Sequence, residues 1–390
     1  MQNLAAALSE RKQQQLYRTR QTLDGPQDVV VHIDGHEYLS FCSNDYLGLA
    51  NHPSLIRALK QGAERFGVGS GAAHLISGHS YAHQALEEEL AEFVGRPRAL
   101  LFSTGYMANL GVLSALTGRG DSVFEDRLNH ASLIDAARLS GARLVRYAHK
   151  DIASLHRKMA HTGTGGRLIA SDGVFSMDGD CAPLVDLAAL AADADAWLLI
   201  DDAHGFGVVG KHGGGWCVDQ LSTASENTVL MATLGKALGT FGAFVAGSDA
   251  LIETLVQQAR TYMYTTAAPP ALAWATRTAL QLVRDGDELR EKLHELLRYF
   301  RSGAAELGLP LMPSETPIQP LLVGDTGAAL ALSAALHEQG ILVTAIRPPT
   351  VAKGTARLRI TLSARHERAQ LDRLLETLAS CHGKAFRVAR

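Results

Sequence analysis

A lysine on a glycine-flanked turn and an acid–histidine pair carry the most reactive chemistry in this sequence. Lys236 lies in the segment Thr-Leu-Gly-Lys-Ala-Leu-Gly, directly after the apolar run 229–232. Asp201 and His204 follow a second apolar run, 197–200. A lysine amine can bind an aldehyde covalently, and a carboxylate can pair with a pyridine nitrogen. Together the three residues indicate a site for pyridoxal 5′-phosphate (PLP), although a strand-end acid alone is as often a cap.

Gly105 and Tyr106 follow the strand expected at 99–102. A glycine at a strand-to-helix turn lets backbone N–H groups face an anion, and the helix start favours phosphate there. Alone, this pattern is more typical of a generic tight turn. Beside a lysine of the kind described, it predicts a phosphate site with Tyr106 near the cofactor.

His130 and Ser176 also follow expected strands. A capping histidine and a turn serine are the ordinary interpretations of these two positions. Because ligands of open parallel sheets bind beyond the carboxyl ends of the strands, both are nevertheless candidates for the same site. An imidazole at His130 could stack on a pyridine ring.

The segment 205–210 matches the dinucleotide pattern G-x-G-x-x-G and follows a strand. That pattern requires a helix to open immediately afterwards. The residues 211–215 are Lys-His-Gly-Gly-Gly, a poor helix former. The segment therefore argues only weakly for a nicotinamide cofactor.

Arg357 and Arg359 alternate with apolar residues, so they share one face of an expected strand. An exposed polar face is the ordinary interpretation. An inward-facing arginine could instead hold a substrate carboxylate through two parallel hydrogen bonds.

Composition limits the classes of protein that remain. The 390 residues are 46% hydrophobic and 20% charged, with a formal net charge of -3, so no basic excess predicts nucleic-acid or membrane binding. Four scattered cysteines predict free thiols, and charged residues interrupt the N-terminus and the apolar stretch 184–200. We expect a cytoplasmic protein. His74, His79 and His83 lie close in sequence without an H-E-x-x-H motif, so we expect no metal.

Short apolar runs alternate with helical patterns, which predicts an α/β fold with a mainly parallel sheet. A helix-like segment at 4–22 precedes a hairpin signal at 29–41, and a strand is expected near 341–346. Seven strands are expected in the large domain, at 99–102, 122–124, 144–147, 167–170, 197–200, 228–232 and 243–246. The expected domains are an N-terminal segment 1–50, a large PLP-binding domain 51–285 and a smaller C-terminal α/β domain 286–390.

Several motifs together resemble the α-oxoamine synthase family of fold-type-I PLP enzymes, which are aspartate aminotransferase-like transferases. The likeness runs nearly end to end and includes 43–49, 105–106, 173–180, 201–205, 233–236 and 347–362. The stretch 344–351 resembles the members that condense L-alanine with a pimeloyl thioester in biotin biosynthesis. Asp172 departs from the family pattern, where glutamate is common, and so do the residues 72–74.

The resemblance implies roles for individual residues. Lys236 would bind the cofactor and move the α-proton, Asp201 would pair with the ring nitrogen, and His204 with the ring hydroxyl. The remaining implied contacts are these: His130 stacking on the ring and touching substrate; Gly105, Tyr106, Ser176 and Thr233 completing the cofactor site; Arg359 and Asn44 on the amino-acid carboxylate; Arg18 and Thr350 on the acyl substrate. Thr265 and Thr266 would reach the phosphate of a neighbouring subunit, which implies a homodimer with sites at the interface.

Three alternatives stay open. A sibling synthase would condense glycine or serine with another acyl-CoA, as 2-amino-3-ketobutyrate CoA ligase, aminolevulinate synthase and serine palmitoyltransferase do. A PLP-binding regulator would need a DNA-binding part, for which the chain has neither length nor basic excess. A nicotinamide-linked dehydrogenase would have to use the segment 205–210. Whether the acyl carrier is coenzyme A or an acyl carrier protein is open as well.

Overall fold

The computed structural model describes residues 3–221 and 225–385. The chain divides into two compact units. The smaller unit comprises Met1–Gly48, Met177–Gly179 and Glu291–Arg390, and the larger comprises Leu49–Ser176 and Asp180–Arg290. The predicted domain bounds at residues 50 and 285 stay predictions.

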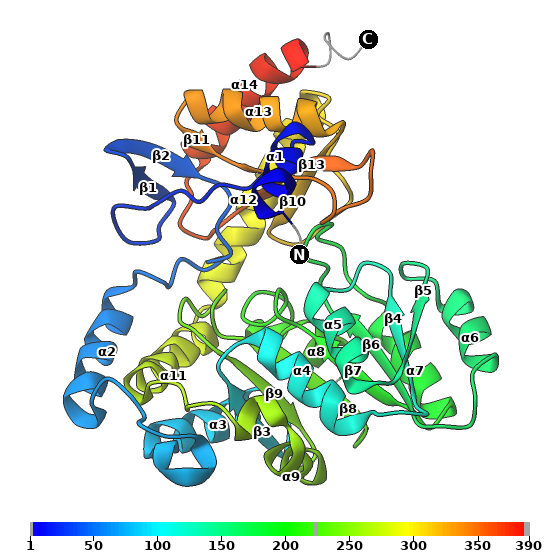
Figure 1. Ribbon diagram of the computed structural model, residues 1–390. Coiled ribbons are helices and arrows are strands. Elements are labelled where there is room, and N and C mark those ends of the chain that lie inside the picture. The colour runs from blue at the N-terminus through cyan, green and yellow to red at the C-terminus, as the bar shows by residue number, and fades with distance from the viewer. Residues whose placement is uncertain (1–2, 222–224, 386–390) are drawn as a thin grey trace. The chain divides into compact units, whose positions relative to one another are not determined.

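A seven-stranded sheet forms the centre of the larger unit, in the order β3-β9-β8-β7-β6-β4-β5 (Figure 1). Neighbours from β8 to β5 run parallel, whereas β9 pairs antiparallel with β8 and β3. The predicted mainly parallel sheet of seven strands is confirmed. Its strands are β3 (Arg98–Phe102), β4 (Ser122–Asp126), β5 (Arg143–Tyr147), β6 (Arg167–Asp172), β7 (Trp197–Asp201), β8 (Thr228–Thr233) and β9 (Ala243–Gly247).

One face of this sheet packs against helices α4 (Gly105–Leu116) and α5 (Ala131–Ser140), which contact each other (Figure 1). Ala170, Leu199 and Met231 belong to the core cluster on this face. Side chains two positions apart on a strand share a face. The polar residues that come two positions later at the strand ends therefore face the same side: Asp172, Asp201 and Thr233.

Further helices surround the sheet of the larger unit. Helix α4 also contacts α9 and α10, and α7 contacts β6 and β7. The bounds of these helices are α2 (Pro53–Phe66), α3 (Tyr81–Phe93), α6 (Ile152–Ala160), α7 (Leu184–Asp193), α8 (Trp216–Gln220), α9 (Asp249–Gln258), α10 (Arg260–Met263) and α11 (Pro270–Arg284). A π-helix at His74–Gly78 and a 3₁₀ turn at Lys211–Gly213 complete the unit.

Two three-stranded sheets lie in the smaller unit, in the orders β1-β2-β11 and β10-β13-β12. Their strands are β1 (Val30–Ile33), β2 (His36–Ser40), β10 (Ile318–Gly324), β11 (Ile341–Leu342), β12 (Thr344–Ile346) and β13 (Ala356–Thr361). The helices are α1 (Leu4–Gln13), α13 (Thr326–Glu338) and α14 (Arg368–Ala385), and α12 (Asp287–Glu306) continues from the larger unit. The hairpin signal is confirmed as β1 and β2.

Two sequence expectations were wrong in detail. The first helix ends at Gln13 rather than at residue 22, and Gln15 has a φ of 57°, which leaves the helical region. The strand expected near 341–346 is two short strands in different sheets, because β11 pairs with β2 and β12 pairs with β13. An apolar run alone does not reveal such a change of partner.

None of the helices formed by residues 3–221 and 225–385 combines the length and apolar character that crossing a bilayer requires.

Candidate active site

One cavity of the larger unit, about 210 Å³ in volume, lies at the carboxyl ends of β6, β7 and β8. It is lined by all eight residues that the sequence predicted for the cofactor: Gly105, Tyr106, His130, Ser176, Asp201, His204, Thr233 and Lys236. Ser132, Asp172, Val174, Ala203 and Met231 complete the lining. These segments are far apart in sequence, and the parallel strand order gathers them at one edge of the sheet.

A hydrogen-bond network fixes the Asp201 carboxylate. Its Oδ1 accepts from the Ala203 N–H at 3.1 Å, and its Oδ2 accepts from the Asn109 amide at 2.8 Å. The same amide donates to Ser132 Oγ, also at 2.8 Å. Asp201 is only 6% exposed, so the carboxylate is held in place and shielded from water.

The network continues to His130. Its Nδ1 accepts from the Ser132 N–H at 3.3 Å and lies 2.7 Å from Ser132 Oγ, which assigns the ring proton to Nε2. Burial lowers the pKa of His130, a change that Asp201 opposes and Lys236 reinforces. A neutral imidazole can present a flat face to an aromatic ring without an ionic charge.

The start of α4 forms another wall of the cavity. Thr104 caps this helix by accepting from the Met107 N–H at 3.1 Å, and Gly105 is its first residue. Unpaired N–H groups and the helix dipole make such an end suitable for a phosphate. The Tyr106 hydroxyl donates a hydrogen bond to Asp135, and Tyr106 is 42% exposed.

Lys236 lies in the loop after β8, half-buried at the cavity wall. Thr233 Oγ1 donates to the Gly242 carbonyl at 3.0 Å and accepts from the Gly235 N–H at 3.4 Å. These bonds tie the loop between Thr233 and Gly242 back onto itself. An amine, an oriented carboxylate, a neutral imidazole and a helix start thus surround one cavity, and this set suits PLP.

The substrate residues predicted in the smaller unit form two groups there. Arg359 Nη1 donates to Asn44 Oδ1 at 3.1 Å, and Arg18 Nη2 donates to Thr350 Oγ1 at 3.1 Å. Arg357, on the same strand as Arg359, is instead paired with Asp178. The structure therefore distinguishes two arginines that the alternating pattern alone left equivalent. The roles proposed for these residues stay predictions.

Sequence reasoning missed three residues as site residues: Ser132 and Asp172, which line the cavity, and Asn109, which binds the Asp201 carboxylate from behind the lining. Asn109 stands one helical turn after Gly105, a spacing that places both on one face of α4. That spacing was the available signal for Asn109. Asp172 was noted only as a departure from a family pattern.

The histidines for which no metal was expected lie together in the structure. Nitrogens of His74, His79 and His83 lie within 4.8 Å of one another. His83 Nδ1 accepts from the Ser80 N–H at 3.0 Å, and its Nε2 lies 2.8 Å from the Ala268 carbonyl. A metal would have to displace these bonds, so the geometry is that of a hydrogen-bonded cluster.

The segment 205–210 follows β7 as a series of turns, and the 3₁₀ turn Lys211–Gly213 comes next. A dinucleotide fingerprint would place a long helix here, with its start at the pyrophosphate. The local structure therefore does not fit that pattern.

Residues 36–378 match the model of a known family, described as aminotransferase class I and II. The chain belongs to the aminotransferase class I and II family. The predicted fold-type-I α/β architecture is therefore confirmed, and so is PLP as the cofactor.

Individual members of this family are similar over nearly the whole chain. The 8-amino-7-oxononanoate synthase of Nitrosococcus oceani is 62% identical, over 95% of this chain and 98% of that protein. A solved 8-amino-7-oxononanoate synthase from Francisella tularensis is 32% identical with a TM-score of 0.78, covering 90% of this chain and 99% of that one. A solved SPT with PLP is 28% identical with a TM-score of 0.92, covering 98% and 97%. The resemblance to α-oxoamine synthases is thereby confirmed.

Proposed function

We propose that this protein catalyses the PLP-dependent decarboxylative condensation of L-alanine with a pimeloyl thioester, giving 8-amino-7-oxononanoate, carbon dioxide and the free thiol carrier in biotin biosynthesis. The observation that carries the proposal is the 62% identity to an 8-amino-7-oxononanoate synthase over 95% of the chain. The cavity around Lys236 supports it, because a lysine, two histidines and a buried carboxylate line it together.

When bound, PLP supplies an electron-withdrawing ring that stabilises negative charge on the α-carbon of an amino acid. The Asp201 carboxylate, held by Asn109 and Ala203, favours the protonated state of a ring nitrogen beside it. Lys236 binds the cofactor and carries the α-proton. His130 contributes a neutral flat surface and an Nε2–H donor at the cavity wall.

Arg359 is the proposed anchor of the alanine carboxylate. Its guanidinium is buried and is oriented by Asn44, whose Oδ1 also accepts from the Tyr46 hydroxyl at 3.3 Å. A guanidinium offers two parallel N–H donors that match a carboxylate. Holding the carboxylate would fix the orientation of the bonds at the α-carbon of alanine. A fixed orientation of the bond to be broken lowers the activation barrier of the reaction.

A cavity of about 790 Å³ in the smaller unit suits the dicarboxylic acyl chain. Arg18 and Arg347 both line it, and Arg347 Nε is buried without a hydrogen-bond partner among the described residues. Burial lowers the pKa of Arg347, and the neighbouring charge of Arg18 lowers it further. Two guanidinium groups in one cavity fit an anion such as the free carboxylate of a pimeloyl group.

We also infer a homodimer in the cytoplasm. Large apolar side chains are exposed on one stretch of the larger unit: Ile56, Leu59, Val68, Leu75, Ile76 and Tyr81. Several large exposed apolar side chains within one segment of the chain support an interface there. Thr265 and Thr266 lie outside the cavity lining, as expected if they serve the neighbouring subunit.

The decisive experiment measures condensation with alanine, glycine and serine against acetyl, pimeloyl and palmitoyl thioesters of coenzyme A, and against pimeloyl-acyl carrier protein. Alanine with a pimeloyl thioester should give the highest kcat/KM. A preference for glycine with acetyl-CoA, or for serine with palmitoyl-CoA, would instead establish a sibling activity. Complementation of a biotin-requiring strain that lacks this step tests the same assignment in cells.

A further inference from the structure

Asp172 is a second acid at the wall of the PLP cavity. It is the last residue of β6, and its register partner on the parallel strand β7 is Asp201. Both side chains face the side of the sheet that carries α4, and both line the cavity. Two carboxyl groups therefore stand side by side at the wall of this cavity.

The two acids differ in how their oxygens are satisfied. Both oxygens of Asp201 accept hydrogen bonds, from Ala203 and Asn109. Asp172 Oδ1 accepts a hydrogen bond from the backbone N–H of His130 at 3.3 Å. In contrast, Asp172 Oδ2 is buried and has no hydrogen-bond partner among residues 3–221 and 225–385. A buried polar atom without a partner is costly, so an unpaired oxygen at a cavity wall indicates a ligand.

Burial and the neighbouring charges favour the neutral form of Asp172. Burial raises the pKa of Asp172 well above its ordinary value, and the neighbouring Asp201 raises it further. The His130 N–H and Lys236 oppose this rise, and Asp126 adds a smaller increase. A carboxyl group in its neutral form can donate a hydrogen bond, which a carboxylate cannot.

We propose that Asp172 binds the contents of this cavity as a neutral carboxylic acid, donating a hydrogen bond from Oδ2 to an anionic oxygen of the cofactor or of the amino acid. Rotation about the terminal side-chain bond, which has a broad preference in aspartate, brings the O–H toward either group. The proposal rests on PLP occupying the cavity. It adds a donor to a site whose other predicted acid, Asp201, acts as an acceptor.

Two substitutions separate donation from charge. Asp172→Asn keeps a neutral group of the same shape, with a carbonyl that accepts from His130 and an N–H₂ that donates. Asp172→Leu keeps the branching of the side chain at a larger volume and removes both functions. Glu125→Gln is the matched control, since Glu125 is a fully buried acid on the adjacent strand β4, burial raises its pKa to about 8, and it does not line the cavity.

The measurements use two arms. The first is the Kd of the apoprotein for PLP, and the second is the Kd of the PLP-loaded protein for L-alanine, from the change in visible absorbance without acyl substrate. Asp172→Asn and Glu125→Gln should stay within about threefold of the unsubstituted protein in both arms. Asp172→Leu should weaken one arm about ten- to hundredfold, the usual effect of losing a hydrogen bond to a charged group.

The measurement that changes identifies the oxygen that accepts the hydrogen bond from Asp172. A weaker affinity for PLP places this oxygen on the cofactor, and a weaker affinity for L-alanine places it on the amino-acid carboxylate. An Asp172→Leu protein that matches the unsubstituted protein in both arms would overturn the proposal. So would an Asp172→Asn protein as weak as Asp172→Leu, because an ionised carboxylate would then be required. Failure of the unsubstituted protein to bind PLP would instead contradict the proposed function.

A second measurement tests the proposal without the Asp172→Leu variant, in case that variant does not fold. The infrared difference spectrum on adding PLP, and then alanine, should show a carboxylic-acid C=O band that shifts in the unsubstituted protein and is missing in Asp172→Asn. A spectrum without such a band, identical in the two proteins, would contradict a neutral acid at this position.

Discussion

Asn109 donates its side-chain amide to Asp201 Oδ2 at 2.8 Å, across 92 positions of the sequence. Its second N–H goes to Ser132 Oγ, which in turn lies 2.7 Å from His130 Nδ1, so a single fully buried amide connects the Asp201 carboxylate to His130 through Ser132. Helix α4 contributes both this amide and the N-terminal end suited to phosphate.

Replacing Asn109 by alanine should weaken PLP binding about tenfold, because Asp201 loses an oriented donor and a buried hydrogen bond to a charged group is lost. Fluorescence titration of the apoprotein with PLP measures the change. Ser114→Ala is the control on the same helix, since Ser114 Oγ bonds only the helix backbone. Equal affinities for Asn109→Ala and Ser114→Ala would show that Asp201 needs no such support.

Lys236→Ala should lower turnover by about 10²- to 10⁴-fold or more, because the α-proton loses its carrier. The variant should also lose the covalently held cofactor. Borohydride reduction followed by peptide mass analysis detects that bond. Lys211→Ala, which changes an exposed lysine, should behave as the unsubstituted protein. A trappable cofactor in Lys236→Ala would disprove the assignment of this lysine.

Arg359→Ala should raise the KM for alanine about ten- to hundredfold and leave the KM for the pimeloyl thioester within about threefold, because the bidentate donor to the carboxylate is gone. Steady-state kinetics with each substrate varied in turn separates the two effects. The comparison variant is Arg357→Ala, which loses the ion pair with Asp178 and should reduce stability without singling out alanine. An equal rise in both KM values for Arg359→Ala would contradict its role.

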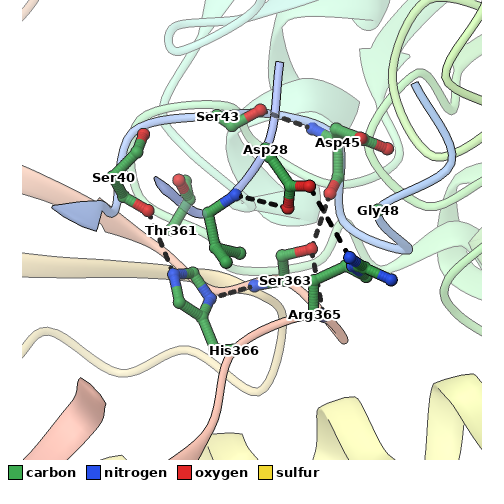
Figure 2. Close-up of a pocket in the computed structure, with 10 residues that line it drawn as sticks. Asp28, Ser40, Ser43, Asp45, Gly48, Thr361, Ser363, Arg365 and His366 are labelled. Atoms are coloured by element: carbon green, nitrogen blue, oxygen red, sulfur yellow. Dashed lines mark hydrogen bonds and ion pairs between the residues drawn. The ribbon is translucent and has the colours of Figure 1, made fainter. Parts of the chain in front are cut away.

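His366 lies in the smaller unit and is hydrogen-bonded through both of its ring nitrogens (Figure 2). Its Nδ1 accepts from the Ser363 N–H at 2.9 Å and its Nε2 donates to the Ser40 carbonyl at 3.0 Å, while the ring stacks on Phe41. Burial lowers the pKa of His366 to about 4, although these two backbone bonds oppose the change.

The folded pKa of His366 lies below the ordinary value of about 6.5, so its contribution to stability is complete above pH 6.5. It is lost as the pH falls from about 6.5 toward 4, by at most about 3 kcal/mol. Urea unfolding at pH 7.5, 6 and 5 should show a smaller pH dependence for His366→Asn than for the unsubstituted protein. His156→Gln, at an exposed position on α6, is the control. An unchanged slope in His366→Asn would mean that other groups cause the acid sensitivity.

Local sequence signals were enough to predict the seven strands and several residues at their ends that line the cavity around Lys236. An apolar run that is followed by a glycine turn, an acid or a lysine indicates where a strand ends. Gly105, Asp201 and Lys236 could therefore be identified as candidate site residues without knowledge of the fold. The hydrophobic pattern is a property of neighbouring residues, and it survives whatever the strands pair with.

Other features depend on which strand lies beside which, and only the tertiary structure decided them. The pairing of β6 with β7 places Asp172 against Asp201, and the packing of α4 on the sheet brings Asn109 to the same acid. The alternating pattern left Arg357 and Arg359 equivalent. The family resemblance placed Asn44 with Arg359, and only the structure shows that Arg357 forms an ion pair with Asp178. Such contacts join residues that are distant in sequence, so the spacing of residues along the chain does not predict them.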